Sequence, residues 1–210
     1  MTIRMLVEPQ FEVDMDLLTT TLADESARKQ AMLIECADVM GIRLTDMSDE
    51  DAAQECLTVL SSANKFAMFL EALRIDVPTK ISPTTGKEIP ALAKTDEEFL
   101  SLQGHQNALV ATAAAARLDA KSTILKTRIQ SFMDAANAHP DKKVPIPLKY
   151  YGADTTGRWS GWGYNPQNLP RINPYDPKPS DALRSSLVAP AGCKIVVADL
   201  SGIELRVNHL

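Results

Sequence analysis

The stretch from residue 105 to residue 138 constrains the fold most, because its 34 residues contain neither proline nor glycine and are rich in alanine. Such a run favours a continuous α-helix, which would be about 50 Å long at a rise of 1.5 Å per residue. Polar residues are spread along all of it, so we expect this helix to be exposed on at least one side. Prolines at positions 140, 145 and 147 follow the run and end it.

Two more helices are predicted before this run. Residues 11–40 carry apolar side chains at steps of three and four residues, and Gly41 follows the last of them. Ser62 is placed to cap a helix from Ala63 to Leu73, whose apolar residues fall on one side. The segment 78–90 is predicted to be an exposed loop, because prolines and a glycine-containing turn interrupt any regular pattern.

The remaining segments predict one more helix start, a loop-rich stretch, and a strand followed by a helix. Thr95 begins a capping box with the acidic residues that follow it, which predicts another helix start. Residues 150–180 hold nine glycines and prolines, together with both tryptophans and all four tyrosines, and are predicted to be mostly loops and turns. Residues 194–200 predict a short buried strand, and Ser201 is placed to cap a helix directly after it.

These elements predict an α+β fold. A mainly helical region with long helices comes first, and a loop-rich segment, one β-strand and one helix follow it. The change of character after residue 147 divides the chain into residues 1–149 and residues 150–210.

The composition is that of a globular chain, with 45% hydrophobic and 23% charged residues and a formal charge of −5. No stretch reaches the roughly 18 apolar residues that a membrane span needs, and the N-terminus lacks the apolar core of a secretory signal. We therefore expect a cytoplasmic protein without membrane contact. Cys36, Cys56 and Cys193 match no disulfide framework or zinc motif, so reduced and mostly buried thiols are expected.

The charges are unevenly distributed. Residues 1–60 carry 4 basic and 13 acidic side chains, whereas residues 117–149 carry 7 basic and 3 acidic ones. A basic helical stretch can neutralise the phosphates of a nucleic acid and release counterions. A solvated helix face has the same composition, so the charge alone leaves both interpretations open.

Asp199 is the sharpest signal for chemistry, because it ends the apolar strand where the last helix begins. A carboxylate there needs a cation or hydrogen-bond donors, and Mg²⁺ would satisfy it. An aspartate that only caps the turn is the alternative. Glu204 is similarly either a capping residue or a side chain in a nucleotide pocket. Arg158, on a turn beside aromatic residues, is compatible with nucleic-acid contact or with a surface ion pair.

Five short motifs follow one another in residues 150–210. They are TGRWS at 156–160, NPQNLPR at 165–171, Arg184, APAG at 189–192, and ADLSGIELR at 198–206 with His209-Leu210 after it. In this order they closely resemble the DNA polymerase I family (family A), in which the last of them is motif A. A looser resemblance covers the remaining residues, and residues 117–123 look like the thumb of these enzymes.

The resemblance implies a role for each matching residue. Asp199 matches the first of the two metal-binding palm aspartates, and the backbone carbonyl of Leu200 matches a further Mg²⁺ ligand. Glu204 matches the glutamate that crowds the sugar 2′ position and selects deoxynucleoside triphosphates. The matching DNA contacts are Arg158, Gln167 and Asn168 near the minor groove of the primer–template, and Lys121, Ser122 and Thr123 at the DNA backbone.

The implied activity is template-directed addition of deoxynucleotides to a primer 3′ end, by phosphoryl transfer assisted by two metal ions. The sequence departs from the family at Gly202, where the family has glutamine, and at Leu200, where it has tyrosine. In the family, the fingers and the second palm aspartate come after motif A. We expect the 210-residue chain to be inactive unless another polypeptide supplies them. The alternatives are a non-enzymatic DNA-binding module and a helical interaction protein.

Overall fold

The structure, a computed structural model, describes residues 8–9, 11–43, 46–169 and 171–196. It is α+β and mainly helical, which confirms the predicted fold class. The chain divides into two compact units, Thr20–Thr127 and a second unit made of Met1–Thr19 and Arg128–Leu210. The predicted boundary between residues 149 and 150 stays a prediction.

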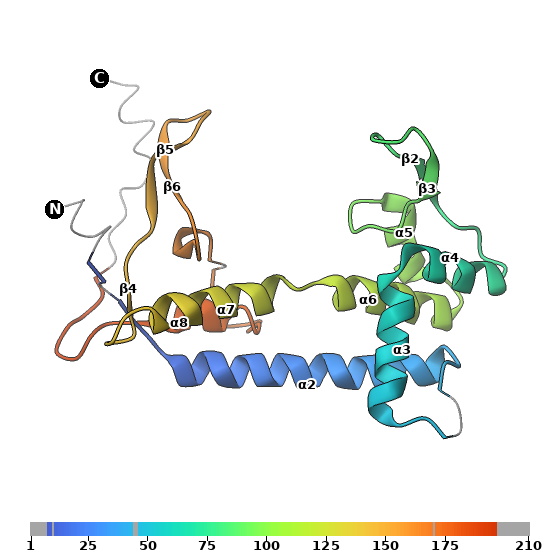
Figure 1. Ribbon diagram of the computed structural model, residues 1–210, viewed down its shortest axis with the longest axis horizontal. Helices are drawn as coiled ribbons and strands as arrows, with labels where there is room; N and C mark the ends of the chain where they lie inside the picture. Colours follow the sequence, from blue (N-terminus) through green and yellow to red (C-terminus); the bar gives the residue numbers. More distant parts are fainter. Residues whose placement is uncertain (1–7, 10, 44–45, 170, 197–210) are drawn as a thin grey trace. The chain divides into compact units, whose positions relative to one another are not determined.

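The unit Thr20–Thr127 consists mainly of helices (Figure 1). In chain order its elements are most of α2 (Met15–Val39), α3 (Asp49–Ser61), α4 (Ala63–Ala72), the hairpin strands β2 (Thr79–Ile81) and β3 (Glu88–Pro90), α5 (Glu97–Ser101), the 3₁₀ helix η1 (Leu102–Gly104), α6 (Ala108–Lys121) and the start of α7 (Ile124–Asn137).

One apolar cluster holds these helices together. Helix α3 packs against both α4 and α6. The ring of Phe66 lies 5.9 Å from that of Phe69 and 6.1 Å from that of Phe99, measured between centroids. Ala113 and Ala114 of α6 are fully buried. The alanine-rich sequence of α6 therefore gives a slim helix that its neighbours can approach closely.

Helix α3 was missing from the sequence-based expectation. Its N-cap is Ser48, whose hydroxyl accepts the N–H of Asp51 at 3.1 Å, and three acidic residues fill its first turn. Ser62 ends α3 and also caps α4, because its hydroxyl accepts the N–H of Lys65 at 3.2 Å. The predicted cap of the helix that begins at Ala63 is thus confirmed.

The single long helix predicted for residues 105–138 is wrong, because the structure divides it into α6 and α7. Ser122 has an extended backbone, with φ −78° and ψ 102°, and its carbonyl accepts a hydrogen bond from the ammonium group of Lys29. Serine and threonine are weak helix formers, so a partner from α2 is enough to interrupt the ladder at Ser122 and Thr123.

The capping box predicted at Thr95 is also wrong. Asp96, not Thr95, is the N-cap of α5, and its side chain makes no capping hydrogen bond. The carboxylate of Asp96 instead accepts the N–H of Ala93 at 2.8 Å and pairs with Lys80 at 2.6 Å. These two donors hold the pKa of Asp96 below its usual value.

Arg28 links α2 to α6 through two carboxylates. Its guanidinium lies 2.8 Å from Glu25 and 2.8 Å from Asp119. These hydrogen bonds lower the pKa of both carboxyl groups in the folded chain. The stabilisation is therefore present above their ordinary pKa values of about 4 and is lost as the pH falls through the lowered values.

The Arg28→Gln variant is expected to lose about 1 kcal/mol of unfolding free energy at pH 7, because partly exposed ion pairs contribute little. In urea denaturation the difference between wild type and variant should close as the pH falls from about 5 to about 2. A difference that stays the same over that range would contradict this account of the network.

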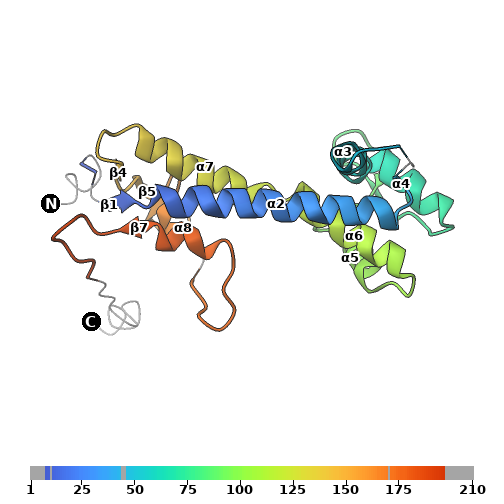
Figure 2. The same cartoon turned by 90° about the horizontal axis from the view of Figure 1, so that it is seen from below.

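The unit Met1–Thr19 with Arg128–Leu210 contains the strands of a small antiparallel sheet, in the order β4-β1-β7 (Figure 2). Its elements are β1 (Phe11–Val13), the start of α2, most of α7, β4 (Lys143–Val144), β5 (Leu148–Ala153), β6 (Arg158–Gly161), the 3₁₀ helix η2 (Pro166–Asn168), α8 (Asp181–Ser185) and β7 (Leu187–Val188). The core includes Leu18, Phe132, Val144 and Leu183, all nearly inaccessible to solvent.

One further expectation for this unit needs correction. The helix predicted for residues 11–40 begins only at Met15, because Phe11–Val13 pair with β4 and β7. Residues 150–180 are mostly loops and turns, as predicted, and the hairpin of β5 and β6 interrupts them. Of the strand predicted over 194–200, residues 194–196 have no regular structure. Residues 197–200 and the predicted helix from Ser201 lie outside the described residues.

The expectation of buried thiols is confirmed for two of the three cysteines. Cys36 and Cys56 are buried, Cys193 is exposed, and all three are free. Within the described ranges, no helix is both long and apolar enough to cross a membrane.

Candidate nucleic-acid interface

The hairpin of β5 and β6 carries the first of the predicted DNA contacts. The two strands pair antiparallel, with Leu148 opposite Gly161 and Ala153 opposite Arg158. The chain reverses through Gly157, whose φ of +65° suits glycine. A Cβ at Gly157 would lie 2.8 Å from the Tyr151 ring, so no larger residue fits this turn. The turn therefore fixes Arg158 at the start of β6.

Gln167 and Asn168 lie on η2, which packs beside β6. A Cβ on Gly161 would lie 2.1 Å from Oδ1 of Asn165 and 3.2 Å from Oε1 of Gln167. Gly161 is thus the residue that lets the side chains around η2 lie against the strand. The carbonyl of Asn168 also accepts a hydrogen bond from Arg128 of α7 at 3.3 Å.

The structure therefore brings three predicted DNA contacts, Arg158, Gln167 and Asn168, to one strand and the adjoining 3₁₀ turn. All three side chains are exposed. Guanidinium and amide groups can donate to the acceptors that every base pair presents in the minor groove. This arrangement suits contact with duplex DNA of any sequence.

Exposed aromatic side chains lie on and directly after the same hairpin. The rings of Tyr150 and Trp159 meet edge to face with centroids 5.2 Å apart, yet Tyr150 is 73% exposed, and Trp162 is 63% exposed. Exposed aromatic rings can stack on nucleobases, which contributes about 1–3 kcal/mol per base. Tyr164 differs, because its ring packs on Phe132 with centroids 4.8 Å apart and its hydroxyl donates to the Pro145 carbonyl. Burial raises the pKa of Tyr164.

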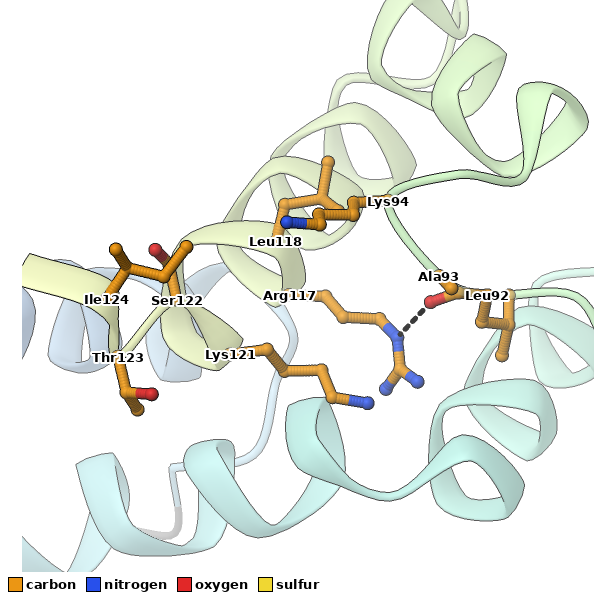
Figure 3. Close-up of a pocket in the computed structure, with 9 residues that line it drawn as sticks. All are labelled: Leu92, Ala93, Lys94, Arg117, Leu118, Lys121, Ser122, Thr123 and Ile124. Atoms are coloured by element: carbon orange, nitrogen blue, oxygen red, sulfur yellow. Dashed lines mark hydrogen bonds between the residues drawn. The ribbon is translucent and has the colours of Figure 1, made fainter. Parts of the chain in front are cut away.

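The other predicted DNA contacts lie in the unit Thr20–Thr127. Lys121 is the last residue of α6, Ser122 and Thr123 form the break before α7, and all three are exposed. They line one cavity of about 320 Å³, shown in Figure 3. The rest of the lining consists of Leu92, Ala93, Lys94, Arg117, Leu118 and Ile124.

Arg117 is the buried cation of this cavity, with 1% of its surface exposed. Its Nη1 donates to the carbonyls of Leu60 and Ser62, and its Nε donates to the carbonyl of Leu92 at 3.3 Å. Its guanidinium also lies 4.9 Å from the centroid of the Phe66 ring. Burial lowers the pKa of Arg117, and burial together with the nearby charge of Arg117 lowers the pKa of Lys121.

Sequence reasoning did not single out Arg117 or Lys94 as parts of this site. A signal for Arg117 exists, because it falls three and four residues after Ala114 and Ala113 on the buried side of α6. Lys94 comes from the loop before α5, and no spacing in the sequence connects it to α6.

The predicted palm residues Asp199, Leu200 and Glu204 lie outside the described residues. Among residues 8–9, 11–43, 46–169 and 171–196, no group of three or more His, Cys, Asp or Glu side chains could hold a metal ion. The predicted Mg²⁺ site thus remains a prediction from the sequence.

Comparison with known proteins found no matching family model, no matching curated protein and no matching solved structure.

Proposed function

We propose that the chain is a segment of a family A DNA-directed DNA polymerase, comprising the thumb region and the beginning of the palm. The observation that carries the proposal is the arrangement of Arg158, Gln167 and Asn168, which come from two separate motifs and lie on β6 and the adjoining η2. The order of the five motifs supports the same function.

In this proposal the described residues bind primer–template DNA. The exposed side chains of Arg158, Gln167 and Asn168 contact the minor groove, where the acceptors are nearly the same for all base pairs. Lys121, Ser122 and Thr123 contact backbone phosphates, which makes the affinity dependent on salt.

In this proposal, motif A supplies the residues that bind Mg²⁺ and select the nucleotide. Carboxylate and carbonyl oxygens are the ligands that Mg²⁺ prefers, so Asp199 and the carbonyl of Leu200 fit this ion by their chemistry. Bound there, Mg²⁺ would stabilise charge on the attacking and leaving oxygens of a phosphoryl transfer. Glu204 would crowd the 2′ position of the incoming nucleotide and so favour deoxynucleoside triphosphates.

Two assays test the proposal. The first measures binding of a primer–template duplex to the chain by fluorescence anisotropy. The Arg158→Ala variant should weaken binding about tenfold, because a hydrogen bond made by a charged group is worth about 1.5–3 kcal/mol. Lys178→Ala is the matched control, since Lys178 is exposed and pairs only loosely with Asp176, at 3.4 Å.

The second assay measures primer extension with Mg²⁺ after a polypeptide carrying the fingers and the second palm aspartate of a family A polymerase is added. Restored synthesis supports the polymerase proposal. DNA binding without restored synthesis would favour a non-enzymatic DNA-binding module. Absence of DNA affinity at low salt would overturn both the polymerase proposal and the DNA-binding module. A helical interaction protein would then be the remaining interpretation.

A further inference from the structure

The buried cysteines Cys36 and Cys56 meet in the core, although they come from different helices. Cys36 lies near the end of α2, and Cys56 lies in the middle of α3, which crosses the last turns of α2 (Figure 1, Figure 2). Both side chains belong to the same apolar cluster, with 1% and 0% of their surfaces exposed. The function proposed above uses neither of them.

The sulfur atoms at this point form a chain of contacts. The thiol of Cys56 donates a hydrogen bond to the sulfur of Cys36, and the thiol of Cys36 donates to Sδ of Met40 at 3.4 Å. Met40 is partly buried against the same cluster. A hydrogen bond between two thiols brings their sulfur atoms next to each other, which is what a disulfide requires before its bond can form.

The two thiols differ in reactivity. The hydrogen bond from Cys56 lowers the pKa of the Cys36 thiol, an effect that burial opposes. The same hydrogen bond raises the pKa of the Cys56 thiol, and burial adds to the rise. Because the thiolate is the nucleophile in cysteine chemistry, Cys36 is the thiol expected to react first with an oxidant.

Cys36 also has a route to small molecules. It lines a cavity of about 310 Å³ together with Met32, Glu35, Thr112, Ala115, Ala116 and Asp119. Hydrogen peroxide is little larger than water, whose share of liquid volume is about 30 Å³, so it fits this space. The charged lining groups, Glu35 and Asp119, are both acidic, which favours an uncharged oxidant over an anionic one. Cys56 is not part of the lining and is reached through Cys36.

We propose that Cys36 and Cys56 form a disulfide cross-link between α2 and α3 when a peroxide reaches Cys36 through this cavity. In the first step the Cys36 thiolate attacks a peroxide oxygen, the O–O bond breaks, and hydroxide leaves and takes up the thiol proton as water. In the second step the Cys56 sulfur attacks the sulfur of the Cys36 sulfenic acid, the S–O bond breaks, and a second water leaves. The thiols lose two electrons and two protons, and hydrogen peroxide gains both.

The cross-link closes the loop that runs from the end of α2 to the middle of α3. Such a bond restricts the unfolded chain more than the folded one, so the oxidised protein should unfold at a higher urea concentration than the reduced protein. A thiol reductant reverses the bond by exchange. The inference does not depend on the proposed function.

The test oxidises the folded 210-residue chain with hydrogen peroxide. Cys193→Ala is the background, because Cys193 is exposed and would join one chain to another. Peptide mapping without reductant should find the peptides of Cys36 and Cys56 joined. The number of thiols that react with Ellman's reagent in urea should fall from two to none, since this variant keeps two of the three cysteines. The urea midpoint should rise and should return to its starting value after dithiothreitol is added.

The variants Cys56→Ala and Cys36→Ala in the same background form a matched pair. Cys56→Ala should accumulate a sulfenic acid at Cys36 that dimedone traps, because the second thiol is missing. Cys36→Ala should give no dimedone adduct at Cys56. In neither variant should the urea midpoint respond to peroxide.

Joined peptides together with a raised midpoint support the proposal. Two free thiols after peroxide treatment, or oxygen added to Met40 or Cys36 without joined peptides, would overturn it. Joined peptides with an unchanged or lower midpoint would show that the folded helices do not accommodate the bond, which also overturns it. A dimedone adduct at Cys56 in Cys36→Ala would overturn the assigned order of reaction. If either alanine variant fails to fold, the peptide map and midpoint of the Cys193→Ala chain decide the question.

Discussion

If the proposed function holds, the Asp199→Asn variant is expected to abolish primer extension by the chain complemented with the fingers and the second palm aspartate, with a rate at least about a thousandfold below that of the unchanged chain. An amide keeps the size of the side chain but removes the negative charge with which a carboxylate would hold Mg²⁺. Metal ions contribute several kcal/mol of charge stabilisation to a phosphoryl transfer, and about 4 kcal/mol corresponds to a thousandfold change in rate. The measurement is single-turnover extension of a labelled primer with saturating Mg²⁺ and nucleotide.

Two comparisons make this result specific. Asp24→Asn removes an exposed carboxylate from α2 and should leave the extension rate unchanged. DNA affinity should also be unchanged in Asp199→Asn, because the proposed DNA contacts are other residues. Extension at more than a tenth of the normal rate in Asp199→Asn would refute the assignment of this residue as a Mg²⁺ ligand.

The helical character of the chain could be predicted from local sequence, but the ends of several helices could not. Ser62 caps α4 through a residue three positions away, and such local chemistry is readable in the sequence. At the break, the Ser122 carbonyl accepts a hydrogen bond from Lys29, which is 93 residues away in the chain. In the same way, Lys80 and Ala93 occupy the carboxylate of Asp96, which leaves the expected capping box unformed.

The strand β1 shows how tertiary pairing can reverse a local preference. Phe11, Glu12 and Val13 fit the helical pattern that continues through α2, yet they pair with β4 and β7. Both partners are short strands of two residues far along the chain, and neither has a sequence signal of its own. The helix therefore begins at Met15, where that pairing ends.

The candidate site was predictable where motifs are local and unpredictable where packing creates it. The turn at Gly157 and the residues of η2 follow directly from two motifs in the sequence. The cavity beside Arg117 arises because α6, the end of α3 and the loop before α5 converge. Basic residues such as Lys94 reach this cavity only through that packing.

The Arg117→Met variant is expected to lose about 4 kcal/mol of unfolding free energy. Methionine fills much of the volume of the arginine side chain, but it leaves the carbonyls of Leu60, Ser62 and Leu92 without their donors. Each buried polar group without a partner costs about 1–3 kcal/mol. The cation–π contact with Phe66 is lost as well and adds about 1 kcal/mol, part of which the methionine–aromatic contact restores. Urea denaturation followed by circular dichroism gives the free energy.

Arg117→Lys separates the charge from the hydrogen-bond geometry. Lysine keeps the positive charge, but its single ammonium group cannot reach carbonyls from α3 and from the loop before α5 at once. We therefore expect this variant to lose about 2–3 kcal/mol, more than half of the loss expected for Arg117→Met. If Arg117→Lys is as stable as the wild type, charge alone is sufficient at this position. A loss below about 1 kcal/mol in Arg117→Met would show that water replaces the guanidinium at these carbonyls, so that Arg117 is not what joins α6 to α3.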